Sequence, residues 1–135
     1  MTVAVAHQVS SASNQLALQV AAREAAWRGS DLAVLHIVDS LDLDISEAYQ
    51  QGLTDDVSEA LKAVGAADLA WRLHLGVGED DVASKVLDLA GQVEASVLVI
   101  GARRRSPTGK FLLGSVTQTL ILEAEVPVLV VKPPL

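Results

Sequence analysis

The segment from Val97 to Thr119 constrains the fold more than any other part of the sequence. The run from Val97 to Ile100 is entirely apolar and is followed directly by Gly101. A short apolar run bounded by glycine predicts a strand buried on both faces, as in a parallel sheet. Ser115 then precedes residues of helical period, which predicts a helix start with Ser115 as its N-cap. A strand, a glycine loop and a helix start direct backbone N–H groups at one point, so we interpret this segment as a phosphate-binding turn.

Apolar strand patterns alternate with helical patterns along the whole chain. Five strands joined by four helical crossovers predict a single α/β domain, residues 1–135, with a parallel sheet and right-handed connections. Residues 40–52 have poor periodicity and several acids, and we expect a flexible connection there with at most one helical turn. The predicted strands cover residues 2–6, 32–38, 69–75 (near a sheet edge), 96–100 and 126–131, and the predicted helices cover residues 12–28, 55–64, 80–90 and 115–124.

Composition narrows the class of protein and of ligand. Half of the residues are hydrophobic and only 3% are aromatic, which suits a parallel sheet covered by closely packed helices. The formal net charge is −7, so binding to nucleic acid is not expected, and the run from Arg103 to Arg105 favours a small anionic ligand. The absence of cysteine excludes thiol catalysis and disulfides. With no long apolar run and no leader pattern, we expect a cytoplasmic protein without a membrane span.

The chain resembles the universal stress protein family over essentially its whole length, and the C-terminal third carries the most specific part of the resemblance. The nucleotide-binding signature of that family is a glycine, two residues, a second glycine, nine residues, and then glycine followed by serine or threonine. Gly101 and Gly114 have the spacing of the outer pair, and Ser115 follows. The sequences around Ile37 and from Val126 to Val131 are also similar to the family. The resemblance implies a five-stranded sheet of order 3-2-1-4-5 with helices on both faces, the Rossmann-like type that binds adenine nucleotides.

The resemblance also implies where a nucleotide binds. The base is expected near His7 and the main chain of Ile37, and the ribose near Gly101. The phosphates are expected at the helix start, with basic side chains of the preceding loop around them. Mg²⁺ is expected only together with ATP, and a homodimer is expected through the strand from Val126 to Val131. The candidate ligand-binding residues are His7, Ile37, Gly101, Arg103, Arg104, Arg105, Gly109, Gly114, Ser115 and Val116.

Two positions depart from the family pattern. The second signature glycine is Arg104, and the acid that usually follows the first strand is His7. Glycine allows close approach of the backbone to a phosphate. Arg104 either redirects the loop or replaces those backbone contacts with a guanidinium group. Arg103, Arg104 and Arg105 can equally form a solvated basic loop, and the glycines an ordinary strand–helix junction.

The other polar and aromatic residues suggest no catalytic or metal centre. Three histidines on separate strands lack the spacing of zinc ligands, and no serine has an evident base, so no catalytic residue is assigned. His36 lies in an apolar run and is predicted to be a structural histidine. Trp27 and Trp71 are expected to pack against the core. His74 is expected to be solvated on an edge strand.

Three functions remain open on this evidence. The first is a stress-response regulator or sensor that binds ATP, AMP or cyclic AMP where the strand order of the sheet reverses. The second is a dimeric interaction module of the same fold that binds no nucleotide, an alternative favoured by the two departures at His7 and Arg104. The third is a slow ATPase, for which the sequence offers no residue that would activate water.

Overall fold

The structure is a computed structural model that describes residues 1–7, 12–38, 46–78, 81–105 and 111–132. Strands and helices alternate through most of it, as the sequence predicts. The elements in chain order are β1 (Thr2–His7), α1 (Ala12–Arg28), β2 (Asp31–Val38), α2 (Glu47–Ala63), β3 (Trp71–Val77), α3 (Val82–Gln92), β4 (Ala95–Gly101), β5 (Arg103–Arg105), β6 (Phe111–Leu112), α4 (Ser115–Glu123) and β7 (Val128–Val131).

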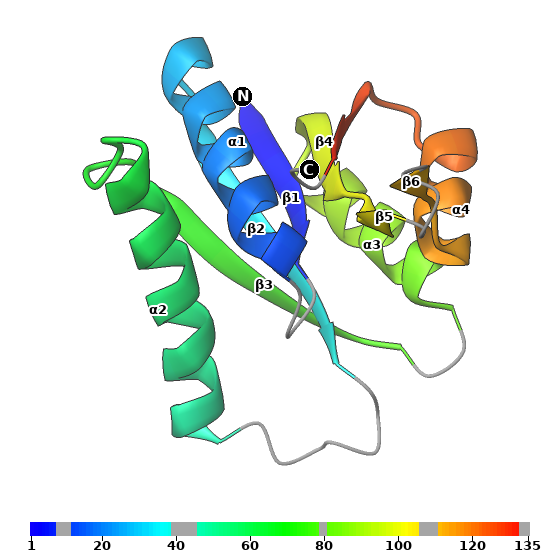
Figure 1. The fold of residues 1–135 in the computed structure, drawn as a ribbon, viewed down its shortest axis with the longest axis horizontal. Coiled ribbons are helices and arrows are strands. Elements are labelled where there is room, and N and C mark those ends of the chain that lie inside the picture. The colour runs from blue at the N-terminus through cyan, green and yellow to red at the C-terminus, as the bar shows by residue number, and fades with distance from the viewer. Residues whose placement is uncertain (8–11, 39–45, 79–80, 106–110, 133–135) are drawn as a thin grey trace.

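A five-stranded parallel sheet forms the centre of the protein (Figure 1). The strands lie in the order β3-β2-β1-β4-β7. Counted within this sheet alone, that is the predicted order 3-2-1-4-5, which the structure confirms. The order reverses between β1 and β4, the neighbours at the centre of the sheet. β3 is an edge strand, as its alternating sequence predicts.

Each face of the sheet is covered by two helices with a core of its own. Val3 and Val5 of β1 pack with α1 and α2, whereas Ala4 between them packs with α3 and α4. This alternation follows from the two-residue period of a strand. All three residues have no exposed surface, because a central strand of a parallel sheet is covered on both sides.

Small residues bring α1 close to the sheet. Ala17, Ala21 and Ala25 are fully or almost fully buried, as their spacing along one side of the helix predicts. Trp27, in the last turn, was expected in the core, and that expectation is wrong because the side chain is 73% exposed. The guanidinium carbon of Arg23 lies 5.3 Å from the centre of the Trp27 ring, a cation–π contact that covers part of the indole at the surface.

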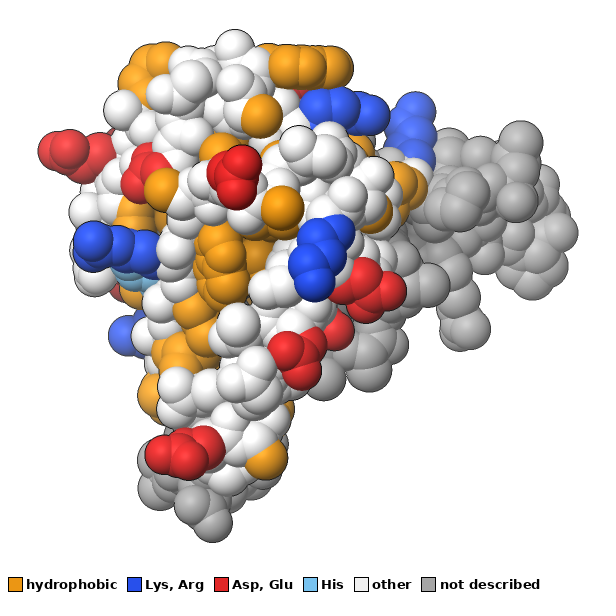
Figure 2. Space-filling view, turned by 90° about the vertical axis from the view of Figure 1, so that its left-hand side faces the viewer, with side chains coloured by type: hydrophobic (Ala, Val, Ile, Leu, Met, Phe, Trp, Pro, Cys, Tyr) orange, Lys and Arg blue, Asp and Glu red, His pale blue; other side chains and the backbone are white. Residues whose placement is uncertain are grey.

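Helix α2 begins eight residues earlier than predicted, at Glu47 instead of residue 55. The Oγ atom of Ser46 accepts a hydrogen bond from the backbone N–H of Tyr49 at 3.2 Å and so caps the helix. The residues of α2 that pack in the core begin only at Leu53, which is why the first turns carry no amphipathic pattern in the sequence. Figure 2 shows the side of the molecule where α2 lies, with a band of hydrophobic side chains between charges of both signs.

The segment between β4 and α4 was expected to be a loop, but part of it is a hairpin. β5 and β6 pair in an antiparallel two-stranded sheet, with Arg103 opposite Leu112 and Arg105 opposite Phe111. The N-cap of α4 is Gly114 and not Ser115, since Ser115 is already the first helical residue. None of the described helices combines the length and the hydropathy that a membrane span requires.

Candidate functional site

The C-terminal edge of the sheet gathers most of the predicted binding residues. His7 ends β1, Ile37 is the last residue but one of β2, and Gly101 ends β4. In a parallel α/β sheet the helix before a strand runs antiparallel to it, so α4 begins at this same edge. Gly114, Ser115 and Val116 therefore lie at the edge where such folds bind ligands (Figure 1).

The start of α4 is built differently from the starts of α2 and α3. Asp81 caps α3 by accepting a hydrogen bond from the N–H of Ser84 at 3.0 Å, and Ser46 caps α2. Gly114, the N-cap of α4, makes no side-chain hydrogen bond. Bonding within α4 begins with the N–H of Gln118, which donates to the carbonyl oxygen of Gly114 at 3.0 Å. The N–H groups of the three preceding helical residues thus have no acceptor within the helix, and they carry the positive end of its dipole.

The hairpin explains the spacing between the two signature glycines. Gly101 stands two residues before Arg103, and Gly114 two residues after Leu112, which is the register partner of Arg103. The hairpin therefore returns the chain from the end of β4 to the start of α4. Backbone pairing is described for Arg103 and Arg105, and the register shifts between them, at Arg104. The side chains of these three arginines, like the whole of Gly109, lie outside the described residues.

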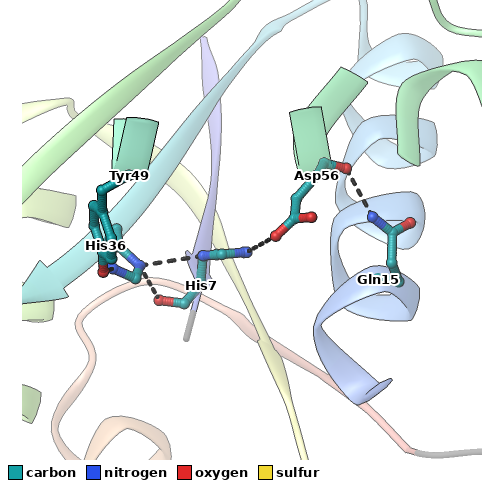
Figure 3. A network of polar contacts seen from close by, with 5 residues as sticks. All are labelled: His7, Gln15, His36, Tyr49 and Asp56. Atoms are coloured by element: carbon teal, nitrogen blue, oxygen red, sulfur yellow. Dashed lines mark hydrogen bonds and ion pairs between the residues drawn. The ribbon is translucent and has the colours of Figure 1, made fainter. Parts of the chain in front are cut away.

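His7 and His36 form the centre of a polar network at the ends of β1 and β2 (Figure 3). They are register partners and are 4% and 2% exposed. His36 Nδ1 lies 3.0 Å from the carbonyl oxygen of His7 and 3.2 Å from His7 Nδ1. His36 Nε2 lies 2.7 Å from the hydroxyl of Tyr49. His7 Nε2 lies 3.8 Å from Oδ2 of Asp56.

Only one arrangement of protons satisfies all of these contacts with neutral rings. A carbonyl oxygen can only accept, so Nδ1 of His36 carries the hydrogen and donates to the oxygen of His7. Nε2 of His36 is then an acceptor, and the Tyr49 hydroxyl donates to it. Nδ1 of His7 faces that same N–H as an acceptor, which leaves the hydrogen of His7 on Nε2, directed at Asp56.

Burial keeps both imidazoles neutral. Burial and, second, the nearby His36 lower the pKa of His7 from 6.5 to about 4, although Asp56 acts in the opposite direction. Burial also lowers the pKa of His36, against the hydrogen bond to the backbone of His7. The network fastens α2 to the strand ends through Tyr49 and Asp56, and Nε2 of Gln15 on α1 donates to the carbonyl oxygen of Asp56 at 2.7 Å.

The side chain of Ile37 lies on one face of the sheet, and its peptide groups lie where the pairing of β1 with β2 ends. The side chain packs with α3 and α4. Leu32 N–H bonds to Ala70 of β3 and the carbonyl of Val38 bonds to Gly78, so even-numbered residues of β2 direct their peptide groups toward β3. Ile37 therefore directs its groups toward β1. The register of β1 with β2 ends at His7 with His36, which places the N–H of Ile37 against the carbonyl of His7. The carbonyl of Ile37 lies beyond the last register pair of the described residues.

Some of this site could be inferred from the sequence and some could not. His36 is a buried, hydrogen-bonded histidine, as predicted, and Trp71 packs against the core. His74 is half-buried instead of fully solvated. The sequence did not predict that three helical residues join this network: Tyr49, Asp56 and Gln15. They lie on helices, and no motif connects them with the strand ends. In the described part of the chain, no three His, Cys, Asp or Glu residues come together as a group that could hold a metal ion.

Comparison with known proteins identifies the family and several relatives. Residues 1–132 match the family model described as the Universal stress protein family. A universal stress protein from Mycolicibacterium smegmatis is 40% identical over 84 residues, which cover 62% of each protein. Another from Methanocaldococcus jannaschii is 32% identical over 90 residues, or 65% of this chain. The chain spans 62% and 53% of the length of these two relatives.

Solved structures with the same fold include two with a bound nucleotide. A universal stress protein from Archaeoglobus fulgidus is 31% identical with a TM-score of 0.74, covering 96% of this chain and 97% of that one. A structure of the universal stress protein from A. fulgidus in complex with dAMP is 25% identical, with a TM-score of 0.69 and coverage of 96% for both chains. A universal stress protein in complex with cAMP is 25% identical, with a TM-score of 0.73 and coverage of 99% and 98%.

Proposed function

The chain belongs to the universal stress protein family, and we propose that it binds an adenine nucleotide (ATP, AMP or cyclic AMP) as a regulator or sensor in a stress response. The related structures with dAMP and cAMP support this class of ligand. The observation that carries the proposal is the start of α4, where Gly114 supplies no side-chain cap and Ser115 is exposed. Free N–H groups and the helix dipole together favour a phosphate at that position.

The bound nucleotide would lie along the C-terminal edge of the sheet. We place the base beside His7 and the peptide group of Ile37, and the ribose near Gly101. Both ring nitrogens of His7 face groups of the protein, so we expect His7 to limit the space around the base more than to bond it. The phosphates would meet the start of α4, with Mg²⁺ only if the ligand is ATP. Arg103, Arg104, Arg105 and Gly109 would complete the site, and Gly114, Ser115 and Val116 would hold the phosphates.

In this proposal the protein acts by a shift of population and not by turnover. A nucleotide that binds one arrangement of the hairpin and of the dimer better than another favours that arrangement by its difference in affinity. We expect the protein to do this in the cytoplasm.

A dimeric interaction module that binds no nucleotide is the second candidate, favoured by the edge of the sheet at β7. β7 pairs only with β4 among the described strands, and its residues Val128, Leu129 and Val130 are only half-buried. Leu122 and Ile121 of the preceding helix are 82% and 38% exposed. An exposed apolar edge strand is usually covered, and we propose that a second copy pairs through the strand from Val126 to Val131. Light scattering across micromolar concentrations should give the mass of a dimer, and a monomer throughout would contradict this proposal.

Equilibrium binding of ATP, AMP and cyclic AMP to protein stripped of ligand tests the nucleotide proposal. We expect at least one of them to bind, and we expect Arg104→Ala to weaken that binding. Gly114→Asp provides the sharper test, because its carboxylate would cap α4 at the place proposed for the phosphate. This variant should lose affinity without losing stability.

Gly91→Asp is the matched control for charge. Gly91 lies in the last turn of α3, at the opposite edge of the sheet, and an added Cβ meets nothing within 4 Å. It should bind the nucleotide as the unchanged protein does. Absence of binding for all three nucleotides at millimolar concentration would refute the proposal and leave the interaction module.

A further inference from the structure

Two glycines at the end of β3 provide the space that the side chain of Ile37 occupies. Gly76 is the register partner of Ile37, and register partners in a sheet place their side chains on the same face. A Cβ atom added to Gly76 would lie 2.8 Å from Cδ1 of Ile37 and 3.2 Å from Cδ1 of Leu89. The end of the Ile37 side chain thus fills the position that a side chain at residue 76 would take, with α3 above it.

Gly78 provides a second space for the other branch of the same side chain. A Cβ at Gly78 would lie 3.3 Å from Cγ2 of Ile37 and 3.1 Å from Cγ of Lys85. The N–H of Gly78 donates to the carbonyl oxygen of Val38 at 3.1 Å, which holds the ends of β2 and β3 together. Neither glycine has a positive φ, unlike Gly29 and Gly65. These two positions therefore need glycine for space and not for backbone conformation.

The space left by Gly76 and Gly78 fixes the side chain of Ile37 and so helps to position its main chain. On the β3 side, the Ile37 side chain occupies the space that Gly76 and Gly78 leave open, in the same apolar cluster as Leu89 of α3. On the β1 side, its N–H faces the carbonyl of His7, whereas its carbonyl lies beyond the last register pair of the described strands, His7 with His36. A shift of the Ile37 side chain away from β3 would therefore move its carbonyl group at the C-terminal edge, where the described part of β1 ends.

We propose that Gly76 and Gly78 are positioning residues for the nucleotide base: by seating the side chain of Ile37, they set where its peptide group meets the base. This inference rests on the proposed function. It assigns the two glycines no contact with the ligand. It also predicts that the chemistry of the side chain at residue 37 matters less than the combined volume of residues 37 and 76.

An exchange of volume between the two register partners tests this proposal. Gly76→Val adds three carbon atoms beside Ile37, and Ile37→Ala removes three carbon atoms from the same place. We expect Gly76→Val to weaken AMP binding by about tenfold, equivalent to ~1.4 kcal/mol. The double variant should recover affinity to within about threefold of the unchanged protein, an antagonistic coupling that independent sites would not show.

Ribose 5-phosphate, which has no base, separates positioning of the base from general damage. Its affinity should be the same in the unchanged protein, in Gly76→Val and in the double variant, because the start of α4 is untouched. Gly91→Val is the matched control, since it adds the same side chain where nothing lies within 4 Å. The backbone amide signal of residue 37 in NMR spectra should shift in Gly76→Val and return in the double variant.

The possible outcomes separate this proposal from the proposed function. If the unchanged protein binds no nucleotide, the proposed function fails and the role of Gly76 fails with it. If it binds AMP and Gly76→Val binds equally well, or the double variant recovers nothing, only the positioning role fails. Equal losses of affinity for AMP and for ribose 5-phosphate would also overturn it, because they would indicate a disturbed fold.

Discussion

The Nδ1 atoms of His7 and His36 lie 3.2 Å apart inside the protein, between the ends of two neighbouring strands. Two imidazoles can approach this closely only if one of the facing nitrogens carries a hydrogen and the other does not. The carbonyl oxygen of His7, 3.0 Å from Nδ1 of His36, decides which one does. The pair therefore links the protonation of two residues that are 29 positions apart in sequence.

The tautomers of the two histidines are the first prediction. His36 should carry its hydrogen on Nδ1 and His7 on Nε2 at neutral pH, for the hydrogen-bonding reasons given above. Two-dimensional NMR of the imidazole nitrogens reads this directly, and the protein has only three histidines to assign. A hydrogen on Nε2 of His36 would contradict the arrangement.

Acid should destabilise the protein through His7. Its pKa is lowered from 6.5 to about 4 in the folded state, mainly by burial. Between these values the unfolded chain binds the proton and the folded chain does not, so stability falls as the pH falls through that range. His7 alone accounts for about 3 kcal/mol of this loss at its full extent, and the lowered pKa of His36 acts in the same direction. Urea unfolding at several pH values measures the effect.

A variant of His7 separates its contribution to acid destabilisation from that of the carboxylates, which also titrate in acid. His7→Asn should have a lower free energy of unfolding than the unchanged protein at neutral pH. This difference should decrease toward pH 4, because acid destabilises the unchanged protein through the buried His7 and the variant lacks that imidazole. If the difference in free energy of unfolding between His7→Asn and the unchanged protein did not change with pH, His7 would not be the source of the acid destabilisation.

Removal of the Tyr49 hydroxyl should have two linked effects. Tyr49→Phe loses the donor to Nε2 of His36, at a cost of about 1 kcal/mol in the free energy of unfolding. It should also raise the pKa of His36, since a hydrogen bond to the neutral imidazole favours the neutral form. Urea unfolding and an NMR titration measure the two effects. A loss of stability with no change in the His36 titration would mean that the hydroxyl bonds elsewhere.

Truncation of a buried side chain in the sheet should lower the free energy of unfolding, because it leaves a cavity. Leu98 on β4 has no exposed surface, and Leu98→Ala should reduce the free energy of unfolding by about 3 kcal/mol. Leu122 on α4 is 82% exposed, and Leu122→Ala should change stability by less than about 0.5 kcal/mol in the monomer. Denaturant unfolding at low protein concentration compares the two variants. Equal effects would show that the assigned burial is wrong.

The fold could be predicted from the sequence because the strands and most helices have a clear hydrophobic period. The first turns of α2 were missed for a physical reason. From Glu47 to Gly52 the side chains face outward or half outward, so no apolar period marks them, and the only local signal is the capping side chain of Ser46. Trp27 was misplaced because the buried side of α1 includes Ala25, and a residue two positions further along a helix points to the opposite side.

The candidate site was predicted where backbone geometry determines it. Gly101 ends a strand and Gly114 precedes a helix, and the apolar run before Gly101 and the helical period after Ser115 predict both within one residue. The contact between His7 and His36 depends on the register of two strands, which one sequence does not specify. Asp56 and Tyr49 reach them from a helix whose start was itself mispredicted. A polar network assembled from four elements leaves no contiguous motif to recognise.

Helix α2 has its apolar anchors only from Leu53 onward: Leu53, Val57, Ala60 and Leu61. The turns before them are held by hydrogen bonds at Ser46 and Tyr49, not by buried aliphatic side chains. Native-state hydrogen exchange should accordingly divide the helix in two, with amides at its front opening far more often than those behind Val57. We therefore expect the front of this helix to unwind and rewind while the sheet stays intact.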